Sequence, residues 1–282
     1  MPKPMTRRQF LRRCLNLGAA AIATPTCGLF YSLRIEPSWL QVERVTVTLS
    51  GLPPVLHGFT IAHLSDFHLG PTVSIGNLRQ AVEVTRELKP DLIALTGDFV
   101  LGSAEYAKPC AQELAALRAP YGVMACLGNH DHWENASLIR RALLDARIPV
   151  LINTGLSLLE GALWIAAVDD VWAGHPDLDA ALAGVPGGAV VLLLAHEPDY
   201  ADTVAERGGV NLQLSGHSHG GQVRLPLIGA PLLPHLGQRY PAGLYRIGNL
   251  TLYTNRGVGT IYPPIRFNCR PEVTLITLTA ES

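Results

Sequence analysis

Five clusters of side chains that commonly bind metal ions each follow a short apolar run of the chain. In order, the clusters are Ser65-Asp66-Phe67-His68, Thr96-Gly97-Asp98, Gly128-Asn129-His130-Asp131, Ala195-His196-Glu197 and Ser215-Gly216-His217-Ser218-His219. Mixed Asp, Asn and His ligands suit Mn²⁺, Zn²⁺ or iron better than Ca²⁺ or Cu(I). Because one carboxylate can bridge two cations, these residues could hold a pair of divalent ions and catalyse metal-assisted hydrolysis.

Taken one at a time, these residues have ordinary structural explanations. Asp98 after Thr-Gly is typical of a turn or helix cap, Asn129 after Gly is typical of a turn, and a lone His196 is usually a satisfied, partly buried histidine. Such explanations do not account for the gathering of most histidines at the ends of apolar runs. Only three histidines lie well away from these run ends: His57, His175 and His235. The joint pattern therefore indicates one metal site.

The apolar runs and the segments between them predict the elements that must position this site. Strands are predicted over residues 42–49, 60–64, 92–95, 123–127, 163–168, 190–194, 212–214, 243–247, 251–254 and 273–278. Helices are predicted over 75–88, 106–117 and 136–146, the first ending before Lys89-Pro90. This order favours a single mixed α/β sandwich over residues 34–282. Loops beyond the carboxyl ends of its strands converge on one edge, so the five clusters can meet there.

In this order the motifs resemble those of the calcineurin-like metallophosphoesterases, over about Phe59 to Gly221. The resemblance implies two mixed β-sheets flanked by helices and a dimetal phosphoester hydrolase. It implies that one ion is held by Asp66, His68, Asp98 and His219. The other ion would be held by Asp98, Asn129, His196 and His217, so that Asp98 bridges the pair. His130 would not bind a metal but would contact the phosphate and protonate or stabilise the leaving oxygen, oriented by Asp131.

The flanking sequences resemble a narrower group, the exported or membrane-anchored bacterial phosphodiesterases. These sequences are Glu36-Pro37-Ser38-Trp39-Leu40 and Gly220-Gly221-Gln222-Val223-Arg224-Leu225-Pro226. The group is similar to an enzyme that hydrolyses UDP-2,3-diacylglucosamine at its pyrophosphate, so a lipid-nucleotide pyrophosphatase is an alternative function. Arg224 and Arg256 are candidates for binding a substrate phosphate, although Asn-Arg-Gly at 255–257 is equally typical of a turn. Several apolar residues could form a lipid-facing lip of the site, which would favour the lipid-nucleotide pyrophosphatase: Ile228, Leu232, Leu233, Ile261 and Tyr262. Ordinary core or loop packing is the simpler explanation of these residues.

The N-terminal segment, residues 1–33, is predicted to be a twin-arginine export signal or an anchor. No acidic residue occurs before Glu36. The segment holds five basic residues: Lys3, Arg7, Arg8, Arg12 and Arg13. Paired arginines ahead of a weakly apolar Ala/Gly-rich stretch are typical of twin-arginine signals. Ala-Ile-Ala at 21–23 suits a signal peptidase, whereas residues 15–33 are about long enough to remain as an anchor. We therefore expect the twin-arginine export machinery to deliver the domain to the periplasm or cell envelope, free or associated with the membrane.

The charge balance argues against a nucleic-acid-binding platform. The sequence has 22 Lys+Arg and 23 Asp+Glu, but without the five basic residues of the N-terminal segment 17 remain, so the body is acidic. A body without a long basic run offers little attraction to a phosphate backbone. The cysteines show no CxxC spacing, which argues against a thiolate zinc site. A non-catalytic metal-binding module of the cell envelope is the alternative from another class, but such a module would not need His130.

Overall fold

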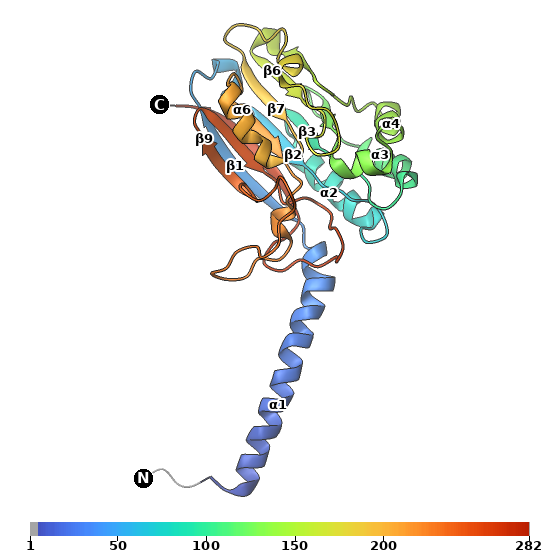
Figure 1. Cartoon of the computed structure of the whole chain (residues 1–282), viewed down its shortest axis with the longest axis vertical. Coiled ribbons are helices and arrows are strands. Elements are labelled where there is room, and N and C mark those ends of the chain that lie inside the picture. The colour runs from blue at the N-terminus through green and yellow to red at the C-terminus, as the bar shows by residue number, and fades with distance from the viewer. Residues whose placement is uncertain (1–4, 282) are drawn as a thin grey trace.

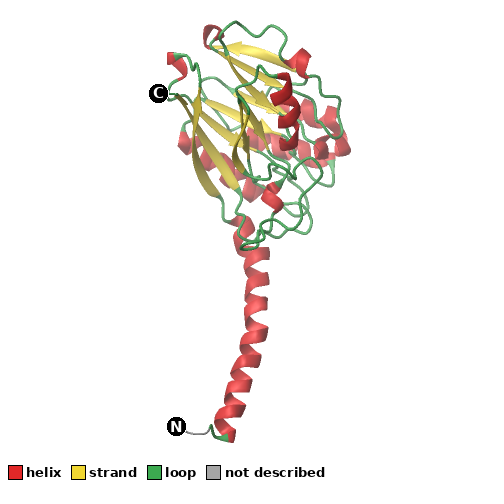
Figure 2. Cartoon of the chain, turned by 60° about the vertical axis from the view of Figure 1, so that its left-hand side comes forward, coloured by secondary structure: helices red, strands yellow, loops and turns green. Residues whose placement is uncertain are grey.

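The computed structural model describes residues 5–281, and within the first helix the side chains of residues 14 and 17–25 are not described. Two β-sheets stack face to face, and helices cover their outer faces (Figures 1 and 2). A long helix, α1 (Arg7–Phe30), projects away from this body. The signal-peptidase site expected at 21–23 falls outside the described side chains.

The first sheet has five strands in the order β1-β11-β2-β3-β4. Their bounds are β1 (Gln41–Leu49), β11 (Glu272–Ala280), β2 (Thr60–Leu64), β3 (Leu92–Thr96) and β4 (Val123–Cys126). Strands β2, β3 and β4 run parallel, β1 runs parallel to β11, and β11 is antiparallel to β2. The sheet is therefore mixed, and its parallel half carries the first three metal-ligand motifs.

The second sheet has six strands in the order β5-β6-β7-β8-β10-β9. Their bounds are β5 (Thr154–Leu158), β6 (Leu163–Ala167), β7 (Val190–Leu194), β8 (Leu212–Ser215), β10 (Leu250–Thr254) and β9 (Gly243–Ile247). The central four strands are parallel, and the edge strands β5 and β9 are antiparallel to their neighbours. The predicted sandwich of two mixed sheets flanked by helices is confirmed.

Alternate side chains of the inner strands pack into different layers. In β7, Leu192 and Leu194 lie in the core between the sheets, whereas Val191 and Leu193 face the helices. Both faces of such strands are buried, which is why they read as continuous apolar runs rather than as an alternation. The helices on the first sheet are α2 (Ile75–Leu88), α3 (Ala107–Leu114) and α4 (Asn129–Asp145), and those on the second are α5 (Leu178–Ala181) and α6 (Ala201–Arg207).

Most predicted elements agree with the structure to within two residues, but α3 ends three residues before its predicted end at 117, and other differences occur at α4, at β5 and at the short helices of the second sheet. Helix α2 has the predicted bounds, but α4 begins seven residues before the predicted start at 136, so that Asn129 opens the helix. A non-helical residue, Asn135 (φ 178°, ψ 91°), interrupts α4 and hides its first turns from a periodicity search. Strand β5 and the short helices α5 and α6 were not predicted, because β5 is a partly exposed edge strand and the two helices span few turns.

The N-terminal helix is joined to the body by hydrogen bonds beyond its carboxyl end. After α1 the chain continues through Tyr31–Ile35 and Glu36–Ser38, and the Ser32 backbone carbonyl accepts from the Arg266 backbone N–H at 2.9 Å. The Glu36 carboxylate is buried and accepts from the Cys269 backbone N–H. Over the part of the chain that the structure describes, no helix combines the length and the apolar character needed to cross a membrane.

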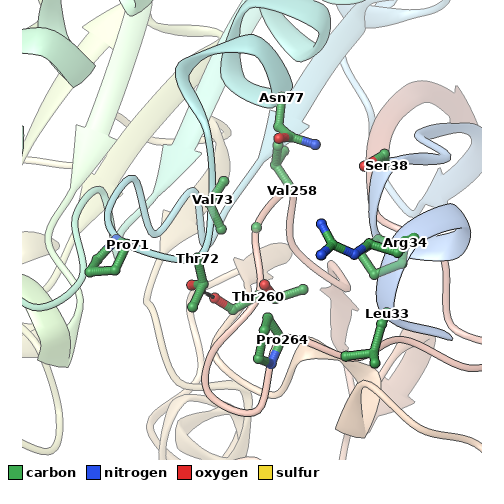
Figure 3. Close-up of a pocket in the computed structure, with 12 residues that line it drawn as sticks. Leu33, Arg34, Ser38, Pro71, Thr72, Val73, Asn77, Val258, Thr260 and Pro264 are labelled. Carbon is green, nitrogen blue, oxygen red and sulfur yellow. Dashed lines mark hydrogen bonds between the residues drawn. The ribbon is translucent and has the colours of Figure 1, made fainter. Parts of the chain in front are cut away.

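A cavity of about 420 Å³ lies where this N-terminal segment meets the body (Figure 3). Arg34 reaches into it from one side, and Val73, Val258 and Thr260 line the others. The adjoining backbone N–H groups of Val258 and Gly259 donate to the carbonyls of residues 65 and 66 at 2.9 and 2.7 Å. Residues 33–38 therefore face the loop that positions the first metal-ligand motif across this cavity.

Candidate metal centre

The loops after β2, β3, β4, β7 and β8 bring the five motifs to one edge of the sandwich. Five of the expected ligands have a left-handed backbone conformation, with φ between 48° and 67°: Asp66, His68, Asp98, His217 and His219. Such conformations are costly for residues other than glycine, so they persist only where the surroundings enforce them. Here the loops are cross-linked, because Asp66 N–H donates to the Gly97 carbonyl and His68 N–H donates to the Asp98 carbonyl, each at 3.0 Å.

One group of ligand atoms consists of Asp66, His68 and His219. The Nε2 atoms of His68 and His219 are 3.0 Å apart, and His219 Nε2 is 3.4 Å from Asp66 Oδ1. All three side chains are buried. These nitrogens and the oxygen therefore face a common point, as the ligands of a single cation do.

A second group consists of Asp98, His196 and His217, with Asn129 beside it. His196 Nε2 lies 3.1 Å from Asp98 Oδ2, and His217 Nδ1 lies 3.0 Å from Asn129 Oδ1. The same Asp98 oxygen is 3.4 Å from His68 Nε2 in the first group. Asp98 therefore stands between the two groups, where a bridging carboxylate must be.

The hydrogen bonds of two histidines fit metal binding. His196 Nδ1 donates to the Thr96 carbonyl at 2.6 Å, and His217 Nε2 donates to the His235 carbonyl at 2.7 Å. Each bond fixes the tautomer and turns the other nitrogen, with its lone pair, toward the site, as is usual for metal-binding histidines. The free nitrogen of His196 is buried and has no hydrogen-bond partner among the described residues. The residues present thus fit a pair of divalent ions.

The electrostatics of the two groups give ionised carboxylates and neutral imidazoles at His217 and His219. At His196, burial opposes protonation, but the Asp98 and Asp66 carboxylates outweigh it and raise the pKa. Burial opposes ionisation of Asp66 and Asp98, but neighbouring histidines outweigh it and hold the pKa of both carboxyls below the usual value. Burial, with His196 nearby, lowers the pKa of His217 to about 4, and burial lowers the pKa of His219. Neutral imidazole is the form that binds metals. Two carboxylates neutralise only part of the charge of two divalent ions, which leaves the centre attractive to a phosphate.

His130 lies beside the ligand groups on the first turn of α4. Its backbone N–H donates to Asp98 Oδ1 at 2.9 Å, and its partly exposed ring meets the His68 ring edge to face, with centroids 4.8 Å apart. Burial lowers the pKa of His130 against the opposing effect of Asp98. The ring therefore stands next to both ligand groups and is reachable from solvent.

Asp131 is placed differently from the expectation that it orients His130. Both of its carboxylate oxygens are occupied by backbone N–H groups, those of Asp98 at 2.9 Å, Phe99 at 2.8 Å and Gly128 at 3.0 Å. Burial and the Asp98 carboxylate raise the pKa of Asp131 to about 7, whereas the hydrogen bonds from Gly128 and Phe99 lower it. Asp131 thus ties the loop of Asp98 to the start of α4 and acts on the bridging ligand rather than on the His130 ring.

Replacing Asp131 by asparagine should loosen this tie, because an amide NH₂ cannot accept from the backbone N–H groups that one carboxylate oxygen serves. We expect a loss of about 1–3 kcal/mol in the free energy of unfolding. We also expect metal affinity to fall about 10- to 100-fold, as when a ligand's supporting residue is changed. Denaturant unfolding and a metal titration measure the two effects. Asp145→Asn, at the exposed end of the same helix, is the control, and equal behaviour of the two variants would contradict this role.

Arg224 and Arg256, the candidates for phosphate binding, are engaged elsewhere. Arg256 forms ion pairs with Glu272 and with Glu43, the latter at 2.6 Å, and Arg224 donates to the Gly220 carbonyl at 3.2 Å. Both line a separate cavity with the two glutamates. The backbone that follows Arg256 does approach the site, since a Cβ on Gly257 would lie 2.7 Å from the Asp66 Cβ. In this segment the backbone at Gly257 thus approaches Asp66, whereas the Arg256 side chain is paired with two glutamates.

Sequence reasoning missed several residues that support the centre. A Cβ on Gly216 would collide with Ser65 and Asp66, so only glycine fits there. Arg266 is fully buried and donates to the carbonyls of residues 256, 257 and 259, which holds this loop against Asp66. The His235 carbonyl fixes the His217 tautomer. Contacts made by backbone carbonyls cannot be inferred from residue types. The glycine of the Gly-His-Ser-His motif, by contrast, indicates a close approach of the backbone to a neighbouring segment.

With this fold and this arrangement of ligands, the chain belongs to the calcineurin-like phosphoesterase family, whose model matches residues 59–221. It is a metal-dependent phosphoester hydrolase with a site for two metal ions. The chain is 36% identical to the uncharacterized metallophosphoesterase YkuE of Bacillus subtilis, over 98% of each chain. It is also 36% identical to the phosphodiesterase YaeI of Escherichia coli, over 95% of this chain and 98% of that one. Among solved structures, TT1561 of Thermus thermophilus shares the fold, with a TM-score of 0.50 and 14% identity over 71% of this chain and 90% of that one.

Proposed function

We propose that the protein is a phosphodiesterase that works outside the cytoplasm or at the membrane surface. The observation that carries the proposal is the shared Asp98 oxygen, which lies within 3.4 Å of a histidine nitrogen in each ligand group, with His130 alongside. A relative that matches nearly the whole chain is named a phosphodiesterase. This name supports a diester rather than a monoester as the substrate.

The residues of the site have two roles: the ligands would bind the metal ions, and His130 would transfer a proton. When bound, the two ions supply Lewis acidity to the phosphoryl oxygens and lower the pKa of the attacking water. Asp66 and Asp98 would fix the positions of the positive charges, and the histidine nitrogens would complete the ligand sets. The His130 ring borders both groups from the solvent side, where it can reach an ester oxygen and supply its proton as the bond to phosphorus breaks.

Chelation followed by a phosphoester panel tests the proposal. We expect dialysis against a chelator to remove hydrolysis of an aryl phosphodiester, and Mn²⁺ or Zn²⁺ to restore it, because each ligand group needs a cation to offset its carboxylates. The panel should include monoesters, diesters, nucleotide diphosphates and UDP-2,3-diacylglucosamine. A preference for monoesters would refute the diester assignment. Metal binding without hydrolysis of any member would favour the non-catalytic metal-binding module instead.

We propose that the N-terminal segment directs export by the twin-arginine route, with the catalytic domain delivered to the periplasm or cell envelope. Arg7 and Arg8 open α1, which projects from the body (Figure 1), and this placement leaves the paired arginines accessible to export machinery. Cell fractionation of the wild type and of an Arg7→Lys/Arg8→Lys double variant tests the proposal. Retention of the variant in the cytoplasm is expected, and unchanged distribution would contradict the route.

A lipid-nucleotide pyrophosphatase of the UDP-2,3-diacylglucosamine type is the second candidate. Several large apolar side chains after the last metal motif are well exposed: Leu227, Ile228, Leu232 and Tyr262. Exposed apolar side chains of this kind favour a site that meets lipid. Cleavage of UDP-2,3-diacylglucosamine well above the simple diesters in the panel would favour this candidate.

A further inference from the structure

Two exposed tryptophans stand against each other beside the metal centre. Trp133 on α4 is 52% exposed and Trp172, in the turn after β6, is 42% exposed. Their rings meet edge to face with centroids 5.0 Å apart. Tryptophan has a large apolar surface and is buried in most proteins, so a pair left open to solvent favours a role in binding.

Each tryptophan of the pair contacts a histidine at the metal centre. The Trp133 ring packs against the His130 ring with centroids 4.8 Å apart. The Trp172 ring packs against the His217 and His235 rings, at 5.8 and 5.4 Å. A group attached to a phosphoryl held at the centre, on the side of His130, therefore comes directly against these two indole rings.

Buried carboxylates fix the turn that presents Trp172. The Trp172 backbone N–H lies 3.1 Å from Asp170 Oδ1 and 3.2 Å from Glu197 Oε1, and Glu197 also accepts from the Val171 N–H at 3.1 Å. Both carboxylates are fully buried. Burying two acidic groups is costly unless they are hydrogen-bonded. Here they hold an exposed ring in one position, as expected of a preorganised binding residue.

A further contact joins the segments that carry the two tryptophans. His132, the residue before Trp133, places its Nε2 atom 2.9 Å from Asp169 Oδ1, close before Trp172 in the chain. Asp169 also accepts from the backbone N–H of His175, which closes the turn. The relative position of the two rings is thus set by contacts on both segments, and does not depend on the ring contact alone.

We propose that Trp133 and Trp172 form an aromatic subsite that receives a planar ring carried by the ester group next to the scissile phosphate. This inference rests on the proposed phosphodiesterase function and deepens it, because it names the class of substrate. The ring could belong to a nucleoside or to an aryl group, since both offer a flat π face to stack on or beside an indole. The subsite sets specificity and takes no part in bond cleavage.

Binding of phosphonates, whose C–P bond resists hydrolysis, tests the subsite without turnover. The probes are methylphosphonate, phenylphosphonate and the adenosine phosphonate analogue of adenosine 5′-monophosphate, each titrated into the Mn²⁺-loaded full chain. We expect the two ring-bearing probes to bind roughly 5- to 100-fold more tightly than methylphosphonate, which is the usual strength of stacking on an aromatic side chain. A preference for one ring-bearing probe alone supports the subsite and identifies the source of the ring.

Variants of the two tryptophans separate stacking from a structural role. In Trp133→Ala and Trp172→Ala the ratio of the dissociation constants of methylphosphonate and phenylphosphonate should fall toward one, and Trp172→Phe should restore much of it. Trp39→Ala, which removes another exposed tryptophan that packs on Arg270, should keep the wild-type ratio. Equal binding of all probes to the wild type, or an equal loss for all probes in the variants, would overturn the proposal. Failure of the phosphodiesterase assignment appears separately, as absence of hydrolysis in a protein that still prefers ring-bearing probes.

Discussion

Asp98→Ala should abolish metal-dependent hydrolysis of an aryl phosphodiester, with a fall in rate of about 10³-fold or more. One Asp98 carboxylate oxygen lies 3.4 Å from His68 Nε2 in one group and 3.1 Å from His196 Nε2 in the other. The other oxygen accepts from the His130 backbone N–H. The substitution therefore removes the bridge and also releases the start of α4, so the remaining ligands cannot hold two ions at a fixed separation.

Metal content is the second readout of the Asp98 variant. Element analysis should find two ions per wild-type chain after reconstitution and fewer in Asp98→Ala. Asp179→Ala is a matched control, because Asp179 is 84% exposed and pairs with Arg207 on the surface. It should keep the wild-type rate and metal content. Full activity of the Asp98 variant, with its fold confirmed by circular dichroism, would refute the two-ion centre.

The strands could be predicted because burial on both faces leaves a direct signature in the sequence. Runs such as the one in β7 have no room for polar residues, so the first polar residue after each run marks both the end of the strand and the edge of the sheet. Residues such as His196, directly after such a run, could therefore be assigned to a common site. Strand β5 could not be predicted in this way, because its residues are only partly buried or exposed and form no continuous apolar run.

The supporting interactions could not be predicted, because they depend on loop conformation. The family resemblance implied that Asp131 orients the His130 ring, but the helical turn directs the Asp131 carboxylate to three backbone N–H groups instead. Arg256 became a candidate because the glycines around it would let the backbone approach a phosphate. Its side chain points to Glu43 and Glu272, while the next residue lies against Asp66. The residue type determines which groups a side chain can bind. The contacts that it makes depend on the backbone conformation, which the sequence motifs do not specify.

His130→Ala should keep both metal ions and lose about 10²- to 10⁴-fold in rate, the usual contribution of a positioned acid or base. The His130 contact to Asp98 is made by the backbone N–H, so it survives removal of the imidazole. The loss should depend on the leaving group, because 4-nitrophenolate departs without a proton whereas an alkoxide needs one. Measuring kcat/KM for diesters of increasing leaving-group pKa should therefore show a growing deficit in the variant.

The metal content of this variant decides between two roles that the geometry allows. The nitrogen of His130 lies close enough to His68 and Asp98 to form a third group of possible ligands. If His130 were a ligand, the variant would lose an ion and its rate would fall equally for all leaving groups. If it is the proton donor, metal content stays at two and only poor leaving groups suffer the full loss. His57→Ala, an exposed histidine outside the site, controls for the removal of an imidazole and should match the wild type in both measurements.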